Sequence, residues 1–306
     1  MEENRAEQLF FLWEKISEGE IRLLRVFGEQ PVVTVPGFID GRCVRELGDS
    51  RRKLPENEIR YSRYCGGMWE SGLSVLKDKE KKDRISSEQE ENIISLETIE
   101  RDGKLHELSE KYIKEVQLPA DIVKIGSCAF YNCTKMERIG VYPKLVEVGS
   151  DAFMNCLNLR SLRMCAGVEE PTGLKQLLAQ IKWQVEVSFE QEDGEREAVL
   201  LYPEYYESYD EIGPAHIFEL NLTGEGFRAR QCFKDGVILL NAYDEIFPQA
   251  CVEESAEVLI PMAWNRLYAA CGLSPEARAD YEEYVREQSG KVLTILLKKQ
   301  RISGLK

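Results

Sequence analysis

The sequence predicts an α+β protein in which a short solenoid of parallel strands, with a period of about 23 residues, carries a charged insertion and continues into an α/β and helical C-terminal region. Three observations support this prediction. Residues 116–164 match themselves when shifted by 23 positions, and a fixed period of about 20 to 29 residues is typical of a solenoid. Residues 49–110 combine dense charge with few apolar side chains. After residue 171 the apolar spacing becomes helical in places.

Each repeat contains an alternating triplet, at residues 116–118, 139–141 and 162–164. A period of two predicts one short strand per repeat, and parallel strands of successive coils lie about 4.8 Å apart. Matching inward residues should then form columns, because one coil cannot bury its own apolar face. The columns expected are Phe130 over Phe153 and Cys133 over Cys156. Gly126 and Gly149 are expected at tight turns, since glycine tolerates positive φ.

The repeat follows the pattern V-x-L-P-x-x-I-x-x-I-G-x-x-A-F-x-x-C-x-x-L. The first unit matches at Pro119, Ile122, Ile125, Gly126, Ala129, Phe130, Cys133 and Met136. The second unit matches at Leu145, Val148, Gly149, Ala152, Phe153, Cys156 and Leu159, and its proline is displaced to Pro143. This pattern resembles the BspA-type leucine-rich repeat. The resemblance is good in residues 112–165, and residues 20–48 resemble a degenerate opening repeat. The resemblance implies a curved solenoid used for protein contacts and implies no catalytic residue.

Five segments are expected along the chain. They are an N-terminal hairpin with the first degenerate repeat (1–48), a charged insertion (49–110), leucine-rich repeats (111–170), an α/β capping and acidic region (171–241) and a helical region (242–306). Two apolar runs around a turn-like cluster at 17–20 predict the hairpin over residues 8–26. In the insertion, the run KDKEKKDR at 77–84 predicts a solvated helix or loop, either a docking arm or a tolerated surface insertion.

Strand and helix signals alternate after the repeats. Thr172 can cap a helix over residues 174–183, and residues 185–187 and 198–202 read as strands. A right-handed crossover would add the first of them as a parallel strand and cap the solenoid end. Further on, an amphipathic helix is expected over 258–270, broken or kinked near Pro261.

The last part of the chain should form a bundle of three helices. Ser274 is expected to cap the second helix, with proline at its first position, and Gly290 to separate it from the third.

Charge limits the classes of partner. The chain has 40 basic and 54 acidic residues and a net charge of −14, which argues against nucleic acid. No apolar run reaches the roughly 18 residues of a membrane span, and no signal peptide is recognised, so a cytoplasmic location is expected. Nine scattered cysteines without a C-x-x-C motif are expected as free, mostly buried thiols. No metal or other cofactor is predicted.

The candidate catalytic motifs in the sequence are incomplete. The sequence Gly224-Glu225-Gly226 lacks the remainder of a phosphate loop. Cys232 with His216 is the most plausible thiol–imidazole pair, although no recognised catalytic context surrounds it. We therefore expect a non-enzymatic protein–protein interaction module whose partner is unknown. The alternatives are an enzyme with its active site in residues 190–306 and a structural subunit of a larger complex.

Two surfaces are candidates for partner binding. The first is the outward side of the solenoid strands, made of Glu115, Gln117, Arg138, Gly140, Ser161 and Arg163. The second is an acidic aromatic patch, made of Tyr205, Tyr206, Glu207, Tyr209 and Asp210. Residues 189–257 hold 17 acidic and 4 basic residues, so this patch could attract a basic partner. The alternative is a solvated hairpin end whose tyrosines pack on the body of the protein.

Overall fold

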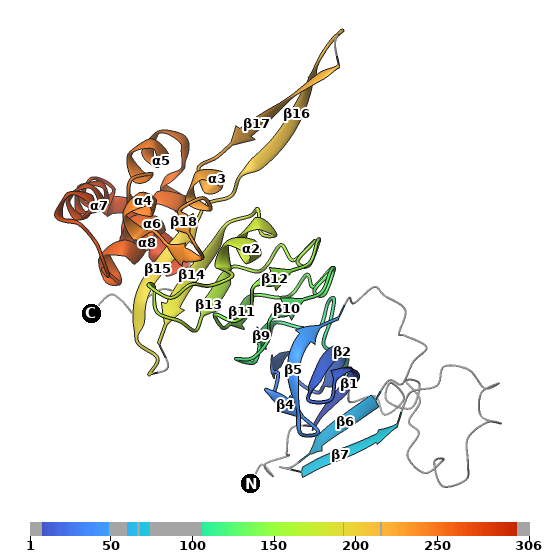
Figure 1. The fold of residues 1–306 in the computed structure, drawn as a ribbon. Helices are drawn as coiled ribbons and strands as arrows, with labels where there is room; N and C mark the ends of the chain where they lie inside the picture. The colour runs from blue at the N-terminus through green and yellow to red at the C-terminus, as the bar shows by residue number, and fades with distance from the viewer. Residues whose placement is uncertain are drawn as a thin grey trace, which may run out of the picture. The chain divides into compact units, whose positions relative to one another are not determined.

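A computed structural model of the chain describes residues 8–48, 60–65, 68–73, 106–191, 193–214 and 216–298 (Figure 1). The chain divides into two compact units, Met1–Leu159 and Arg160–Lys306. The first unit contains the N-terminal sheet and stacked coils, and the second contains a three-stranded sheet, a long hairpin and helices. The predicted class, a parallel-strand solenoid followed by a helical region, is confirmed.

The N-terminal hairpin consists of β1 (Gln8–Ser17) and β2 (Glu20–Gly28), which pair antiparallel as predicted. Their apolar side chains are buried, and Phe10 of β1 lies 6.1 Å from the Phe27 ring of β2. Trp13 is fully buried and donates a hydrogen bond from Nε1 to Ser62 Oγ at 3.0 Å. The hairpin therefore has a core of its own beside the repeats.

Strands β6 (Arg60–Cys65) and β7 (Met68–Leu73) extend this sheet from the free edge of β1. They lie inside the stretch 49–110, for which only a charged insertion was expected. Strand β8 (His106–Glu107) adds to β2 from the end of the same stretch. The prediction for residues 77–84 lies outside the described residues.

One line of parallel strands in the first unit consists of β3 (Val32–Thr34), β9 (Glu115–Gln117) and β11 (Arg138–Val141). Val33, Val116 and Ile139 lie in register and are buried. This register confirms that an opening coil precedes the repeats, as expected from residues 20–48, although 83 positions separate Val33 from Val116.

A second line consists of β5 (Arg42–Leu47), β10 (Lys124–Ile125) and β12 (Glu147–Val148), again parallel and in register. The short strand β4 (Phe38–Ile39) pairs antiparallel with β5. β5 also pairs parallel with β2, so the order of this sheet is β12-β10-β5-β2-β1-β6-β7. The hairpin sheet and the coils are thus one continuous hydrogen-bonded structure.

The columns predicted from the period are present in the core. The rings of Phe130 and Phe153 stack with centroids 5.3 Å apart and an angle of 11° between their planes. Cys133 and Cys156 are both buried, and a hydrogen bond with Cys156 together with burial raises the pKa of Cys133. The cysteines at positions 43, 128, 133, 156, 165, 232, 251 and 271 are free thiols.

The two repeat glycines have a different role from the one predicted, because neither has a positive φ. A Cβ on Gly126 would lie 2.7 Å from the backbone carbon of Gly48, and one on Gly149 would lie 2.4 Å from the nitrogen of Ser127. These glycines therefore allow neighbouring coils to approach closely. The left-handed positions fall instead on two matched pairs, listed here with their φ angles: Cys128 (56°) with Asp151 (55°), and Asn132 (59°) with Asn155 (64°).

The second unit begins with β13 (Ser161–Met164), α2 (Leu174–Ala179) and β14 (Val185–Glu190). β14 pairs parallel with β13, and β15 (Arg196–Tyr202) returns antiparallel to β14, as the sequence predicted. The helix ends four residues earlier than expected and its N-cap is Gly173. Thr172 still accepts a hydrogen bond at Oγ1 from the backbone N–H of Leu174, at 3.3 Å.

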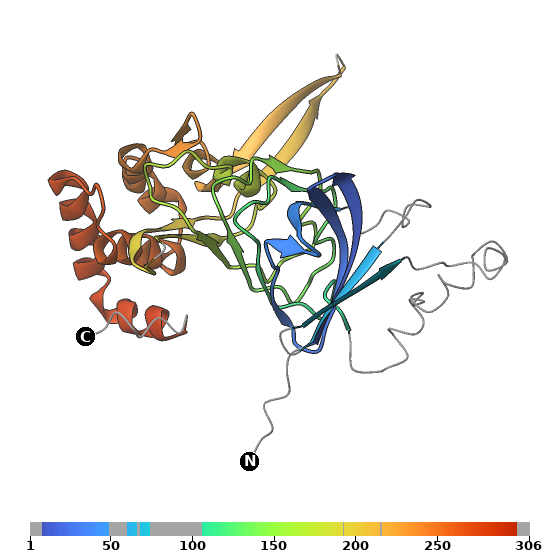
Figure 2. The ribbon, with the colours of Figure 1, turned by 60° about the horizontal axis from the view of Figure 1, so that its bottom comes forward.

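A long hairpin of β16 (Tyr206–Ile212) and β17 (Ile217–Thr223) follows and projects from the sheet and helices of its own unit (Figure 2). The chain then forms α3 (Gly226–Ala229) and a small ladder of β18 (Phe233–Lys234) with β19 (Val237–Ile238). Nearly all residues of both hairpin strands are exposed.

The unit ends in helices α4 (Leu240–Asp244), α5 (Phe247–Glu253), α6 (Ala256–Tyr268), α7 (Pro275–Glu287) and α8 (Ser289–Lys298). The last three contact one another, as the predicted bundle requires. α6 continues through Pro261 without a break. Ser274 caps α7 as predicted, accepting a hydrogen bond at Oγ from the N–H of Ala277 at 3.1 Å, and Gly290 lies in the first turn of α8.

Candidate interaction surfaces

The outward side of β3, β9 and β11 carries two rows of side chains. Val32, Glu115 and Arg138 form the first row, because they pair in register across the three strands. Arg138 donates from Nη2 to Glu115 Oε2 at 2.6 Å and from Nε to the same oxygen at 2.9 Å. This hydrogen bond to Glu115 raises the pKa of Arg138. The row is thus an exposed ion pair that ends at an exposed valine.

Thr34, Gln117 and Gly140 form the second row. Gly140 is buried, because the side chain of Gln117 lies across it: a Cβ on Gly140 would be 1.9 Å from Gln117 Oε1. The amide of Gln117 also donates from Nε2 to the carbonyl of Leu118 at 3.0 Å. Of the predicted contact residues, Gly140 therefore contributes room for Gln117 and little surface of its own.

Two members of these rows, Val32 and Thr34, were missing from the predicted set. Val32 is 45% exposed and Thr34 is exposed as well. The signal was present in the sequence, since Val33 and Val35 reproduce the inward positions of the strand triplet and place residues 32 and 34 outward.

Ser161 and Arg163, the other predicted members, lie on β13 in the second unit. Ser161 is half-buried and Arg163 is exposed, with its Nη1 3.8 Å from Glu190 Oε2 on β14. Within the second unit, Arg163 therefore lies on the same side of the sheet as Glu190 at the end of β14.

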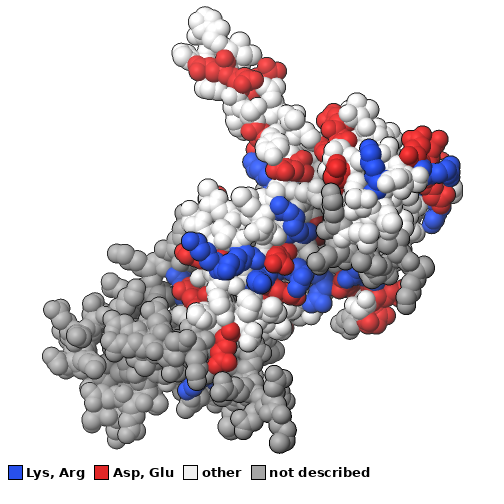
Figure 3. All heavy atoms as spheres, turned by 180° about the vertical axis from the view of Figure 1, so that it is seen from behind, with Lys and Arg blue, Asp and Glu red and all other residues white. Residues whose placement is uncertain are grey.

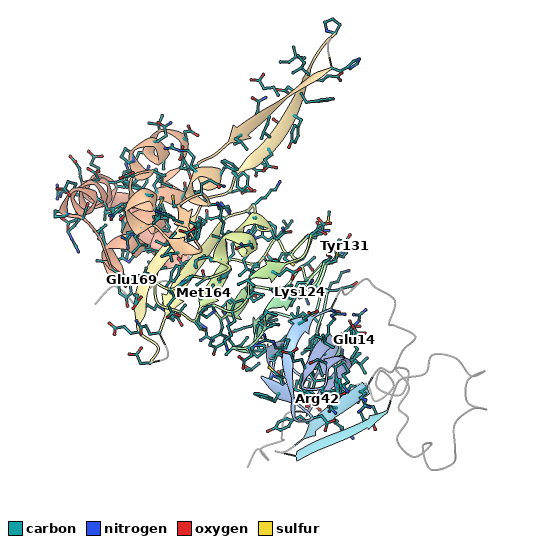
Figure 4. All side chains as sticks on the ribbon, in the orientation of Figure 1. Glu14, Arg42, Lys124, Tyr131, Met164 and Glu169 are labelled. Carbon is teal, nitrogen blue, oxygen red and sulfur yellow. The ribbon has the colours of Figure 1, made fainter. Side chains whose placement is uncertain are left out.

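Polar ladders connect residues 23 positions apart in successive coils. Lys124 donates from Nζ to Glu147 Oε1 at 2.6 Å, and Asn155 donates from Nδ2 to Asn132 Oδ1 at 2.6 Å. Lys144 with Asp121 and Ser150 with Ser127 repeat the relationship. Figure 3 shows interspersed basic and acidic side chains, and Figure 4 labels Lys124 on its coil. In these two ion pairs, each charge is balanced by an opposite charge on the neighbouring coil.

The predicted acidic aromatic patch is divided by the hairpin. Tyr205 precedes β16 and is only 5% exposed. Tyr206 and Asp210 share one face of the ribbon, whereas Glu207 and Tyr209 share the other, because alternate residues of a strand point to opposite sides. These five residues therefore do not form one patch.

Arg230 fixes the root of the hairpin. Its guanidinium is buried and donates to four backbone carbonyls: Ile181 at 3.0 Å, Pro203 at 2.6 Å, Gly226 at 2.8 Å and Trp183 at 3.0 Å. Burial lowers the pKa of Arg230 to about 10, so the group remains charged at neutral pH. These four carbonyl oxygens surround the charge, and they tie three separate loops to one side chain.

Tyr205 completes the root. Its ring lies 5.1 Å from the Arg230 guanidinium and 5.7 Å from the Phe227 ring. Its N–H donates to the carbonyl of Lys182 at 3.1 Å, and Lys182 forms an ion pair with Glu207 at 2.6 Å. The hairpin therefore starts from a packed base, and these contacts fix the position of that base.

Residues 91–171 match a family model described as "BspA type Leucine rich repeat region (6 copies)". The coils within this range are therefore similar to BspA-type leucine-rich repeats. No curated protein and no solved structure matches the chain. A BspA-type repeat region indicates a protein-interaction module, and the ladders and rows described above are the surfaces that these coils display.

Outside the BspA-type repeats, the candidate catalytic groups are not brought together. His216 lies at the exposed tip of the hairpin beside Glu211, whereas Cys232 is buried and its thiol approaches the carbonyl of Arg228. Burial raises the pKa of Cys232 to about 11, which is opposite to the shift that activates a nucleophilic thiol. Gly224 has a φ of 91°, and a Cβ there would lie 2.7 Å from the carbonyl oxygen of Glu204, so it serves the turn after β17.

None of the described helices is both long and apolar enough to cross a membrane. No group of three or more His, Cys, Asp or Glu side chains in the described ranges is arranged to hold a metal ion.

Proposed function

We propose that the protein is a non-enzymatic protein-binding module and that its contact surface is the outward side of β3, β9 and β11. The exposed row of Val32, Glu115 and Arg138 carries this proposal. It places an apolar contact beside a charged pair, and the flat row of Gln117 and Gly140 lies next to it. An interface needs such accessible, rigidly placed groups, and backbone hydrogen bonds between the three strands hold them in register.

We infer that the partner is a protein, because a chain with a net charge of −14 repels the nucleic-acid backbone. Charges on this surface would select the partner and speed its association more than they would add affinity. The apolar contribution would come from Val32 and from the aliphatic parts of Gln117 and Arg138.

A charge swap tests the proposal without disturbing the fold. Glu115→Arg together with Arg138→Glu retains the ion pair but exchanges the positions of the two charges. The matched control is Lys124→Glu with Glu147→Lys, which makes the same exchange on the other line of strands. The original chain and the two double variants are each used for affinity capture from an extract of the native cells. The melting temperature of each chain is also measured.

The expected result is that the control retains the same specific protein as the original chain, while the Glu115/Arg138 swap loses it at an unchanged melting temperature. Equal retention by all three chains would place the contact elsewhere. A stable stoichiometric complex without exchange of the partner would favour a structural subunit over a reversible binding module.

A further inference from the structure

The hairpin β16–β17 is an exposed ribbon whose side chains stand out on both faces (Figure 4). Seven residue pairs join its strands, and no other described strand pairs with either of its outer edges. An isolated two-stranded ribbon is at best marginally stable in water. The packed root formed by Arg230 and Tyr205 fixes where it begins, but nothing in the described residues covers its length.

The two faces differ in polarity. The register places four large apolar residues on one face, and we call them the apolar stripe: Tyr209 (66% exposed), Phe218 (64%), Leu220 (46%) and Leu222 (40%). Three of them alternate along β17. The middle of the opposite face is polar and consists of Ser208, Asp210, Glu219 and Asn221. Tyr206, Ile212 and Ile217 lie at the two ends of that opposite face. A ribbon with a continuous apolar stripe along one strand resembles an edge of a sheet from which a neighbouring strand is missing.

Charge indicates what can lie against this ribbon. The strands carry four carboxylates, Glu207, Asp210, Glu211 and Glu219, and the sequence has no Lys or Arg between Arg196 and Arg228. Figure 3 shows acidic side chains and no basic ones along the projecting arm. Two copies of this hairpin placed edge to edge would bring like charges together. A cationic segment would be attracted instead.

The two edges of the ribbon are not equivalent. On β16, Glu207 and Glu211 interrupt the apolar face, and Glu207 is already paired with Lys182. On β17, Phe218, Leu220 and Leu222 form an uninterrupted apolar series, and Glu219 lies between them on the other face with Asp210 as its cross-strand neighbour. A strand that alternates apolar and basic residues matches this edge on both faces.

We propose that β17 accepts, as a third strand, an extended segment of a partner protein in which apolar residues alternate with Lys or Arg. The apolar residues of that segment continue the apolar stripe, and its cations lie over Glu219 and Asp210. Backbone hydrogen bonds along the edge of β17 provide affinity, and the alternation provides register. This site is independent of the proposed surface on β3, β9 and β11.

A synthetic peptide of alternating valine and lysine, with blocked ends and about nine residues long, is the probe. Its affinity for the full chain is measured by calorimetry at low and at high salt. A peptide of the same composition with the valines and lysines in separate blocks tests register, and a valine–glutamate peptide tests charge. Leu220→Ser and Glu219→Lys change the proposed edge, whereas Val252→Ser changes an exposed apolar residue elsewhere in the same unit.

The alternating peptide is expected to bind at least tenfold more tightly than the block peptide. Leu220→Ser and Glu219→Lys should each weaken it about tenfold, while Val252→Ser and Arg138→Glu leave it unchanged. Equal affinity for the two lysine peptides, or no loss in Leu220→Ser, would overturn the proposal. A dimer seen by sedimentation in the original chain and abolished by Leu220→Ser would show that a second copy occupies this edge instead.

Discussion

Arg266 and Asp244 form a fully buried, two-pronged ion pair in the helical part of the second unit. Arg266 donates from Nε to Oδ1 at 2.8 Å and from Nη2 to Oδ2 at 2.9 Å. The hydroxyl of Tyr281 donates to the same Oδ1 at 2.8 Å, and the carbonyls of Ala269 and Cys271 each accept a further guanidinium hydrogen. The pair therefore connects α4, α6 and α7 through one carboxylate.

Removing either partner of this pair should be strongly destabilising. Arg266→Met leaves a buried carboxylate, and Asp244→Asn leaves a buried guanidinium without its counter-charge. Each is expected to lower the free energy of unfolding by about 3–5 kcal/mol. Urea denaturation followed by circular dichroism measures the loss. Arg278→Met, at an exposed arginine of α7, is the control and should change little. A loss below about 1 kcal/mol for Arg266→Met would contradict the buried pair.

Two neighbouring tyrosines should respond oppositely to loss of their hydroxyl groups. Tyr243 donates to the carbonyl of Leu201 at 2.6 Å, whereas the buried hydroxyl of Tyr202 has no hydrogen-bond partner in the described part of the chain. Tyr243→Phe should cost about 1 kcal/mol or more, because a hydrogen bond is lost. Tyr202→Phe should leave stability unchanged or raise it, because an unsatisfied polar group is removed. Thermal unfolding of both variants provides the comparison, and a larger loss for Tyr202→Phe would refute the assignment.

Close packing of the coils predicts a large effect for a single methyl group. In Gly149→Ala, the added carbon meets the backbone of Ser127, which has no rotamer that relieves the clash. We expect a loss of about 1–3 kcal/mol or more, as for other overpacked sites. Gly19→Ala is the matched control, since nothing lies within 4 Å of its added carbon and its φ is not positive. If denaturation shows similar small effects for the two variants, the coils are more loosely packed than described.

The carboxyl group of Glu225 predicts a dependence of stability on pH. Burial raises the pKa of Glu225, despite its ion pair with Arg228 at 3.1 Å. The folded state therefore holds this proton to higher pH than the unfolded chain, and the group's contribution to stability falls as pH rises from about 4.5 through the folded pKa. Glu225→Gln removes this contribution. Its stability relative to the original chain should increase between pH 4 and pH 7, as measured by urea midpoints at each pH; a constant difference would argue against the burial effect.

Much of the solenoid was predictable because the physical requirement repeats. Phe130 and Phe153 stack as expected, and the opening strand around Val33 pairs with the coil that follows the insertion. Strands β6 and β7 were missed because they join the sheet through the pairing of β6 with β1, which is far away in sequence, and because charged residues surround them. Their local composition does not reveal a sheet edge that a distant segment provides.

The candidate surfaces were only partly accessible to sequence reasoning. Alternation correctly placed Arg138 outward, but the covering of Gly140 by Gln117 depends on a side-chain conformation. For the hairpin, a ribbon end was only an alternative, since nearly all of its positions are exposed and no burial pattern marks a strand. Its amphipathic character emerged only when the register paired Tyr209 with Leu220.

The ladders at a spacing of 23 residues restrict how a chain of this kind can change in length. Adding or deleting one whole coil leaves every donor opposite an acceptor and every ring over a ring, as with Asn132 and Asn155 or Phe130 and Phe153. Adding 22 or 24 residues puts all of these pairs out of step at once. Between directly consecutive coils, a longer or shorter form is therefore expected to differ by complete turns, whereas the long insertion that separates Val33 from Val116 leaves the strand register intact.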